Sequence, residues 1–293
     1  MTKRTKAEIF LFVCTFIWGG TFVVVKQGLD NASPFVFIAV RFGIATLLFA
    51  PFAIRHLKGI TAKSLLHGSI LGILLWIGFA TQTVGLEYTT ASKSGFITGL
   101  LVIFTPLFQI IIEKRPPKTG NMIGVVLVVV GLYFLTSPTG SSFNIGDGLT
   151  LICAAVFGLY IVYLDVFSKE SSFWHLVFMQ FVLTALLSAI ASPFLEIPRF
   201  VPTGNLLLGL AYLSLLATVL TLTLQTRYQK DTTPTRAAVI FSLEPVVAAA
   251  TAYLALGETI GNIGILGGFL VVTGLLVSEL SDYLFTSRPK IAD

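Results

Sequence analysis

The feature that most constrains this chain is a succession of apolar runs of about twenty residues, separated by short polar, Pro or Gly segments. A helix needs roughly 20 apolar residues to cross about 30 Å of hydrocarbon, whereas a membrane β-barrel alternates apolar and polar residues. Runs such as 120–135 are continuous, which favours helices. Only 11% of the 293 residues are charged, against about 25% in a soluble domain. The sequence therefore predicts an all-α integral membrane protein in contact with the lipid bilayer.

Dividing the chain at its polar, Pro and Gly residues gives ten candidate membrane helices. The N-terminal run is too long for a signal peptide and has no convincing cleavage site, which predicts a retained first span. The short connections leave no room for an extramembrane domain. The predicted spans are 7–27, 34–54, 65–86, 91–112, 119–136, 148–167, 172–193, 204–225, 234–256 and 262–283.

Loop charges test this count of ten. Ten spans return the C-terminus to the side of the N-terminus, and that side holds all but four of the 19 Lys and Arg residues. The opposite side has only Lys26, Lys93 and Arg199, and Arg41 lies within a span. Basic loops mark the cytoplasmic side, so both termini are predicted to be cytoplasmic in a bacterial inner membrane. The net charge of +5 then reflects these loops and gives no reason to expect nucleic acid as a partner.

The two halves of the chain resemble each other at three places. Five helices per half is an odd number, so the second half must insert upside down relative to the first, as in many secondary transporters. The matching positions are 14–19 with 153–158, 82–83 and 89–90 with 225–226 and 232–233, and Gly124 and Gly131 with Gly267 and Gly274. We therefore expect a first repeat over 1–136, a linker over 137–147, a second repeat over 148–283 and a cytoplasmic tail over 284–293.

Residues for catalysis are scarce. The histidines His56, His67 and His175 lie far apart, in or beside loops, and no HExxH, CxxC, GxSxG or Walker A motif is present. The sequence therefore predicts no enzyme activity, no metal site and no cofactor.

Two charged residues lie inside predicted spans. Arg41 could hold a substrate carboxylate or a helix C-terminus, or its long side chain could reach the outer interface and serve only as an anchor. Glu244 lies halfway along its span and could take part in proton coupling. The alternative for Glu244 is pairing with a backbone group or a basic side chain that anchors helix packing, and the sequence favours this interpretation.

Prolines within two predicted spans each remove a backbone hydrogen bond and are expected to kink the helix. Pro106 and Pro245 are therefore hinge candidates, and static kinks that only shape the bundle are the equal alternative. The two positions do not match between the halves, because Pro106 lies four residues later than its counterpart in the repeat.

Aromatic and polar residues in mid-span are the remaining candidates for a substrate cavity, although each could equally pack against lipid or a neighbouring helix. Trp18 is the best of them, because the glycines that follow it allow another element to approach closely. The other candidates are Thr21, Trp76, Phe79, Gln82, Phe96, Thr98, Tyr160, Tyr163, Phe241 and Ser242.

At these positions the chain resembles the EamA family of the drug/metabolite transporter superfamily. The resemblance lies in Trp18–Phe22, in Pro34–Phe42, in Thr89–Ser92 and above all in Thr235–Pro245 followed by Leu256–Glu258. It implies ten helices in two inverted five-helix repeats around a central cavity, with the fifth and tenth helices at the periphery. It also implies export or exchange of small metabolites such as amino acids, nucleosides or drugs.

The predicted function is therefore that of a secondary transporter. It would export small organic metabolites, with amino acids (aromatic or hydrophobic ones among them) first, by alternating access. Protons are a candidate coupling ion, and facilitated movement down a gradient is as plausible. The four-residue glycine spacings are expected to pack within one chain, which predicts a monomer. The alternative is a membrane scaffold that transports nothing and needs no solvated cavity.

Overall fold

The computed structural model describes residues 2–136, 143–256 and 261–285, and within these ranges the chain is helical. The predicted linker over 137–147, the predicted tail over 284–293 and Glu258 lie wholly or mainly outside the described residues. The first half contains α1 (Lys3–Gly19), α2 (Thr21–Gly28), α3 (Pro34–Leu57), α4 (Ala62–Tyr88), α5 (Ala91–Gly99), α6 (Leu101–Glu113) and α7 (Thr119–Thr136). The second half contains α8 (Ile145–Glu170), α9 (Phe173–Leu195), α10 (Gly204–Ser214), α11 (Thr221–Tyr228), α12 (Pro234–Phe241), α13 (Glu244–Leu256) and α14 (Asn262–Phe285).

Seven helical segments in the described part of the chain are long and apolar enough to cross a membrane. Two shorter apolar helices, Thr119–Phe134 and Asn262–Ser278, accompany them. The prediction of an all-helical, multi-pass membrane protein is therefore confirmed, whereas the count of ten spans stays a prediction. The seven segments are Lys3–Gly28, Pro34–Leu57, Ala62–Tyr88, Ala91–Glu113, Ile145–Glu170, Phe173–Leu195 and Gly204–Asp231.

Several of these segments are interrupted in mid-span. α1 and α2 meet at Gly20, α5 and α6 meet at Leu100, and α12 and α13 are separated by Ser242 and Leu243. A six-residue π-helix, Leu215–Leu220, joins α10 to α11. Interrupted helices expose backbone groups at membrane depth, and such groups occur only where protein or a cavity covers them. The interruptions therefore locate the region that could hold a solute.

The polar loops gather at two opposite ends of the bundle. At one end Lys63 pairs with Glu170 at 2.9 Å. At the other end the Ser33 hydroxyl donates to Glu196 at 2.8 Å, and Arg199 donates to the Leu29 carbonyl oxygen at 2.8 Å. Residues that the loop charges assign to one side of the membrane are thus in contact with each other.

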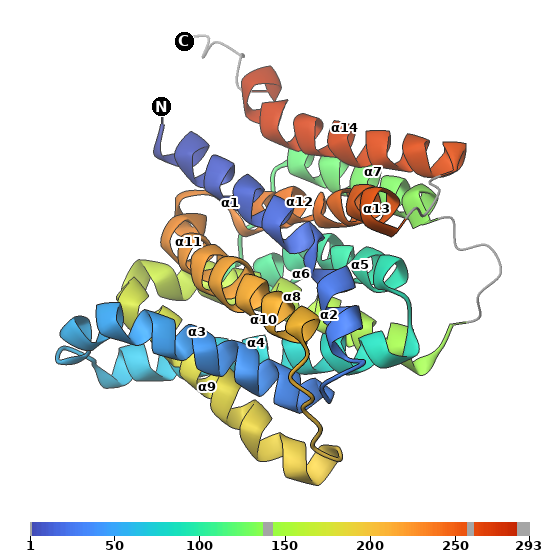
Figure 1. Ribbon diagram of the computed structural model, residues 1–293. Helices are drawn as coiled ribbons and strands as arrows, with labels where there is room; N and C mark the ends of the chain where they lie inside the picture. The colour runs from blue at the N-terminus through green and yellow to red at the C-terminus, as the bar shows by residue number, and fades with distance from the viewer. Residues whose placement is uncertain (1, 137–142, 257–260, 286–293) are drawn as a thin grey trace.

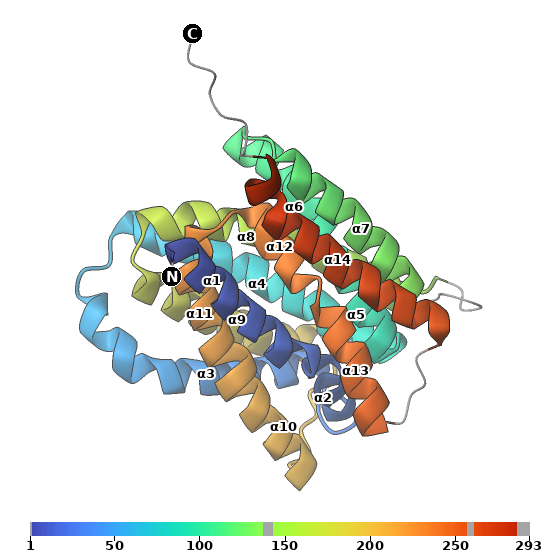
Figure 2. The ribbon, with the colours of Figure 1, turned by 90° about the horizontal axis from the view of Figure 1, so that it is seen from above.

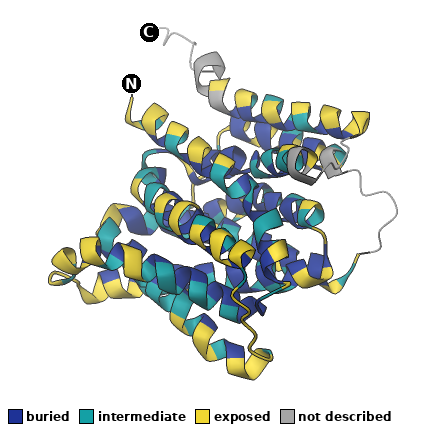
Figure 3. Ribbon diagram, viewed as in Figure 1, coloured by how far each residue is buried: buried dark blue, intermediate teal, exposed yellow. Residues whose placement is uncertain are grey.

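The helices α7 and α14 lie side by side at one edge of the bundle (Figures 1 and 2). Their contact is built on glycines, because a Cβ atom on Gly124 would lie 2.7 Å from the Gly274 carbonyl oxygen. A Cβ atom on Gly131 would likewise lie 2.7 Å from the Gly267 carbonyl oxygen. Their outer faces carry exposed apolar side chains such as Phe269, and exposed residues of the whole bundle face outward in Figure 3. Apolar outer faces of this kind fit contact with lipid.

Candidate functional site

A small cavity lies among the interrupted helices and is lined by both halves of the chain. The centre of a water-sized sphere can move over about 60 Å³ within it, so the cavity has room for water. The lining residues are Trp18, Thr21, Arg41, Leu75, Phe79, Gln82, Thr98, Leu101, Phe157, Tyr160, Ile161, Leu222, Gln225, Phe241 and Glu244.

Most of the candidates taken from the sequence meet on this wall, and four do not. Trp76 and Phe96 pack against the apolar core. Tyr163 stacks on Phe167 with ring centroids 5.2 Å apart. Ser242 is fully buried, and its hydroxyl donates to the Val239 carbonyl oxygen at 2.6 Å.

The wall also contains residues that sequence reasoning did not select. Gln225 had a usable signal, because it is the counterpart of Gln82 in the internal repeat. The others are apolar and look like any lipid-facing or packing residue in the sequence; they are Leu75, Leu101, Phe157, Ile161 and Leu222.

Arg41 points into the protein, where only 4% of its surface is exposed. Its Nε donates to the Thr218 hydroxyl at 2.8 Å, and its guanidinium carbon lies 4.7 Å from the centre of the Phe79 ring. No carboxylate pairs with Arg41 among the described residues. The interpretation of Arg41 as an anchor at the outer interface is therefore wrong.

The π-helix explains why Arg41 turns inward. The wide turn of a π-helix makes its carbonyl groups available to side chains, and here the Ala217 carbonyl oxygen accepts several hydrogen bonds. Its donors are Arg41 Nη2 at 3.3 Å, the indole nitrogen of Trp18 at 3.0 Å and the Thr221 hydroxyl at 2.8 Å. The carbonyl group thus holds the cation at the cavity and stabilises it there.

Glu244 begins α13 and lines the cavity. Within the described ranges its carboxylate has neither a hydrogen-bond donor nor a basic side chain within pairing distance. Arg41 lines the same cavity, so the two opposite charges lie in one neighbourhood. This geometry gives no support to the expectation that Glu244 only anchors helix packing.

The Gln225 amide oxygen is a second polar atom with no partner among the described residues. The amide nitrogen of the same side chain donates to Gln229 at 2.9 Å, which in turn donates to the Ile161 carbonyl oxygen at 2.7 Å. The Gln225 amide oxygen is buried and, in the part of the chain that the structure describes, accepts no hydrogen bond. Leaving a buried acceptor unsatisfied costs about 1–3 kcal/mol, which a small movement that opens it to a solute or water in the cavity can offset.

Aromatic rings form much of the remaining wall. Trp18 packs against Phe241 with centroids 5.3 Å apart, and Phe79 packs edge-on against Phe157 at 5.5 Å. The Tyr160 hydroxyl donates to Gln180 at 2.5 Å. The cavity thus combines a cation, an acid and an amide oxygen with apolar walls, which suits a small solute that carries both charge and apolar surface.

The hinge candidates occupy different places in their helices. The interruption before α13 lies at Ser242 and Leu243, so Pro245 is the second residue of α13 and stands in its first turn, where the missing N–H removes no intrahelical hydrogen bond. Pro106 lies inside α6, whereas the interruption of that span falls earlier, at Leu100. A Cβ atom on Gly99 would lie 3.0 Å from Pro245 Cγ, so the two interruptions are in contact.

No cluster of His, Cys, Asp and Glu among the described residues could hold a metal ion.

Residues 5–137 and 144–280 each match the EamA-like transporter family. An uncharacterized transporter of Archaeoglobus fulgidus is 38% identical and aligns over 95% of this chain and 87% of its own length. The uncharacterized inner membrane transporter YedA of Escherichia coli K12 is 25% identical over 96% of this chain and 93% of its own. A solved crystal structure with 18% identity covers 97% of this chain and 99% of its own with a TM-score of 0.81, which shows a shared fold.

Proposed function

Because this chain belongs to the EamA-like transporter family, we propose that it is a secondary transporter that exports small amino acids and related metabolites by alternating access. It acts as a monomer in the plasma membrane with both termini in the cytoplasm. A relative named as an inner membrane transporter supports this location. The observation that carries the proposal is the cavity that joins both halves and holds Arg41 and Glu244 without an ion-pair partner among the described residues.

The architecture proposed is two inverted five-helix repeats over 1–136 and 148–283. Two separate matches of one family, over 5–137 and 144–280, support this division. The glycine contact supports the inversion: Gly124 and Gly131 are the repeat counterparts of Gly267 and Gly274, and each meets the counterpart of the other. Such a reciprocal pattern is what a two-fold axis produces.

The proposed substrate carries a carboxylate and an ammonium group. Arg41 receives the carboxylate and Glu244 receives the ammonium, because each can form charge-assisted hydrogen bonds that the protein itself leaves unmade. The side chain of the solute faces rings such as Phe79 and Phe157. The cavity, with about 60 Å³ for the centre of a water-sized sphere, fits a compact amino acid as it stands. Larger aromatic amino acids require it to widen.

Transport by the purified protein in liposomes tests the proposal. We expect uptake of small apolar amino acids into preloaded vesicles, and much weaker movement of the matching amino amides, which lack the carboxylate. Absence of movement for every amino acid and metabolite in the panel would favour the scaffold alternative.

A pH gradient across the same vesicles tests the role of Glu244. If protons are coupled, the gradient should drive accumulation, and Glu244→Gln should abolish the accumulation, while exchange of labelled for unlabelled substrate continues with a raised KM because the ammonium loses a charged partner. If the gradient has no effect on the unmodified protein, the transporter is a facilitator and Glu244 acts only in binding.

A further inference from the structure

Two polar clusters at opposite ends of the bundle join one half of the chain to the other. In the first, here called the Lys93 cluster, Lys93 of α5 pairs with Asp147 of α8, with Nζ 2.6 Å from Oδ2. The Thr89 hydroxyl donates to the other carboxylate oxygen of Asp147 at 2.7 Å. Asp147 is fully buried. This cluster therefore fastens the start of α5 to the start of α8.

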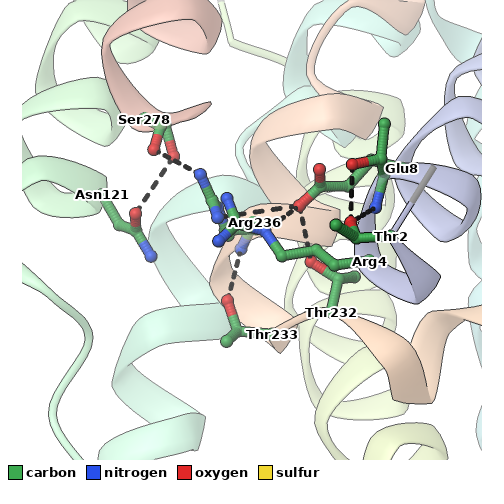
Figure 4. A network of polar contacts seen from close by, with 9 residues as sticks. Thr2, Arg4, Glu8, Asn121, Thr232, Thr233, Arg236 and Ser278 are labelled. Atoms are coloured by element: carbon green, nitrogen blue, oxygen red, sulfur yellow. Dashed lines mark hydrogen bonds and ion pairs between the residues drawn. The ribbon is translucent and has the colours of Figure 1, made fainter. Parts of the chain in front are cut away.

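The second, the Arg236 cluster, joins α12 to α1. Arg236 lies 3.7 Å from the carboxylate of Glu8, and the Thr232 hydroxyl donates to the same carboxylate at 3.2 Å. Arg4 donates to Glu8 at 2.8 Å, and Arg236 also donates to the Ser278 carbonyl oxygen at 2.9 Å. Figure 4 shows Arg236 between Glu8 on one side and Ser278 on the other.

The two clusters occupy equivalent positions in the internal repeat. Thr89 and Lys93 precede Thr232 and Arg236 by 143 positions, the offset that also relates Gln82 to Gln225. Glu8 precedes Asp147 by 139 positions, the offset that relates Cys14 to Cys153. Each cluster thus contains one base, one acid and one threonine at matching places, and Arg4 adds a second base to the Arg236 cluster.

The local backbone repeats as well. Thr90 caps α5 by accepting a hydrogen bond from the Lys93 backbone nitrogen at 3.2 Å. Thr233 caps α12 in the same way, by accepting from the Arg236 backbone nitrogen at 3.4 Å. In both halves the cap fixes the basic side chain at the same turn of a short helix that ends at an interruption.

We propose that the Lys93 cluster and the Arg236 cluster are two latches that close the cavity, the first toward the outside and the second toward the cytoplasm, and that they open alternately. This inference rests on the proposed transport function. The short helices that the latches hold, α5 and α12, carry Thr98 and Phe241 to the cavity wall. Releasing one latch frees one wall to swing at its interruption, and both latches are closed in this structure.

Opposite charges suit this role for a physical reason. The ion pairs and the charge-assisted hydrogen bonds around them weaken as their atoms separate, so each latch has a closed and an open arrangement. Weakening one latch shifts the population toward the state in which that side is open, in proportion to the interaction lost. The structure therefore predicts that the two latches have opposite effects on access.

Cysteine labelling tests this prediction without knowledge of the substrate. In a protein with Cys14→Ala and Cys153→Ala, Leu222→Cys places a single thiol on the cavity wall, and a membrane-impermeant maleimide is applied to vesicles from one side at a time. Lys93→Met should raise the labelling rate from outside about tenfold, equivalent to about 1.4 kcal/mol, and lower it from inside. Arg236→Met should do the reverse.

A matched control and a rescue keep the result specific. Lys63→Met breaks the exposed Lys63–Glu170 pair and should leave both labelling rates unchanged. The exchanged pair Lys93→Asp with Asp147→Lys should return the rates toward those of the reference, which also covers the case in which Lys93→Met folds poorly. The proposal is wrong if Lys93→Met and Arg236→Met change the labelling rate equally from the same side. It is also wrong if neither substitution changes the labelling rate of folded protein. If the protein transports solutes but the substitutions leave its labelling rates unchanged, the latch proposal is wrong. If the substitutions shift labelling in opposite directions but the protein transports nothing, the latches are supported and the proposed transport function is wrong.

Discussion

The two halves of the molecule meet in two contrasting ways. At the edge, α7 and α14 approach so closely through glycines that a Cβ atom on Gly131 would lie 2.7 Å from a carbonyl oxygen. At the centre, the halves are separated by a cavity whose wall includes Arg41, Glu244 and an unsatisfied amide oxygen of Gln225. The edge contact consists of closely packed backbone with no space for another side chain, whereas the central contact is lined in part by polar side chains and encloses a cavity.

This difference follows from the solvent. Lipid gives no hydrophobic reason for helices to associate, so a permanent contact in a membrane depends on close packing, which small residues allow. Polar groups at the same depth are costly unless they find partners. The edge contact is therefore suited to staying closed, and the central one is suited to accepting a solute. Changes at the edge should affect stability, and changes at the centre should affect binding.

The largest expected effect is at the centre. Arg41→Gln removes the cation and with it charge-assisted hydrogen bonds worth about 1.5–3 kcal/mol, which should raise the KM for amino acids about 10–100-fold. The matching amino amides should lose much less. Uptake measured for both solutes checks this, with Arg227→Gln as the control, since Arg227 lies over the Phe173 ring outside the cavity. An equal loss for acid and amide would show that Arg41 only supports the structure.

A substitution at the edge contact between α7 and α14 should lower the stability of the protein, whereas the substitution at the centre affects substrate binding. Gly131→Val inserts a side chain where none fits and should destabilise the protein by about 1–3 kcal/mol. Thermal unfolding in detergent measures this. Gly43→Ala is the matched control, because a Cβ atom there meets nothing within 4 Å, and alanine should leave stability unchanged or raise it. A normal melting temperature for Gly131→Val would show that the edge contact is loose.

The sequence was sufficient to predict the membrane helices, because each of them is a long stretch of residues surrounded by lipid. Continuous apolar runs predict membrane helices directly, because the bilayer imposes a minimum length. The positions of the interruptions were not predictable in the same way. Pro245 marks one of them, but the interruption at Leu100 precedes Pro106 by six residues, and the glycine beside it, Gly99, resembles the many glycines that lie inside uninterrupted helices. The π-helix at Leu215–Leu220 likewise has no such marker.

For the candidate site, residue type was informative only where it was unusual for a membrane span. Arg41, Gln82 and Glu244 are conspicuous in an apolar helix, and all three line the cavity. Leu75 and Phe157 are the same residue types that face lipid, so only their neighbours in space identify them. The direction of Arg41 depends on a carbonyl group that the π-helix presents from a distant part of the chain, and no local pattern contains that information.

The smallest expected effect separates the two glutamines that the repeat relates. Gln225→Leu removes the unsatisfied amide oxygen at the cavity and should raise the KM for amino acids about 2–10-fold, since a neutral hydrogen bond contributes about 0.5–1.5 kcal/mol. The amide of Gln82 already donates to the Thr98 hydroxyl at 3.1 Å, so Gln82→Leu should lower thermal stability more than affinity. Uptake kinetics and unfolding of both variants decide the matter. If Gln225→Leu lowers stability and leaves KM unchanged, its amide belongs to the packing of α11 against Gln229, and the central contact is less open to a solute than the contrast with the edge implies.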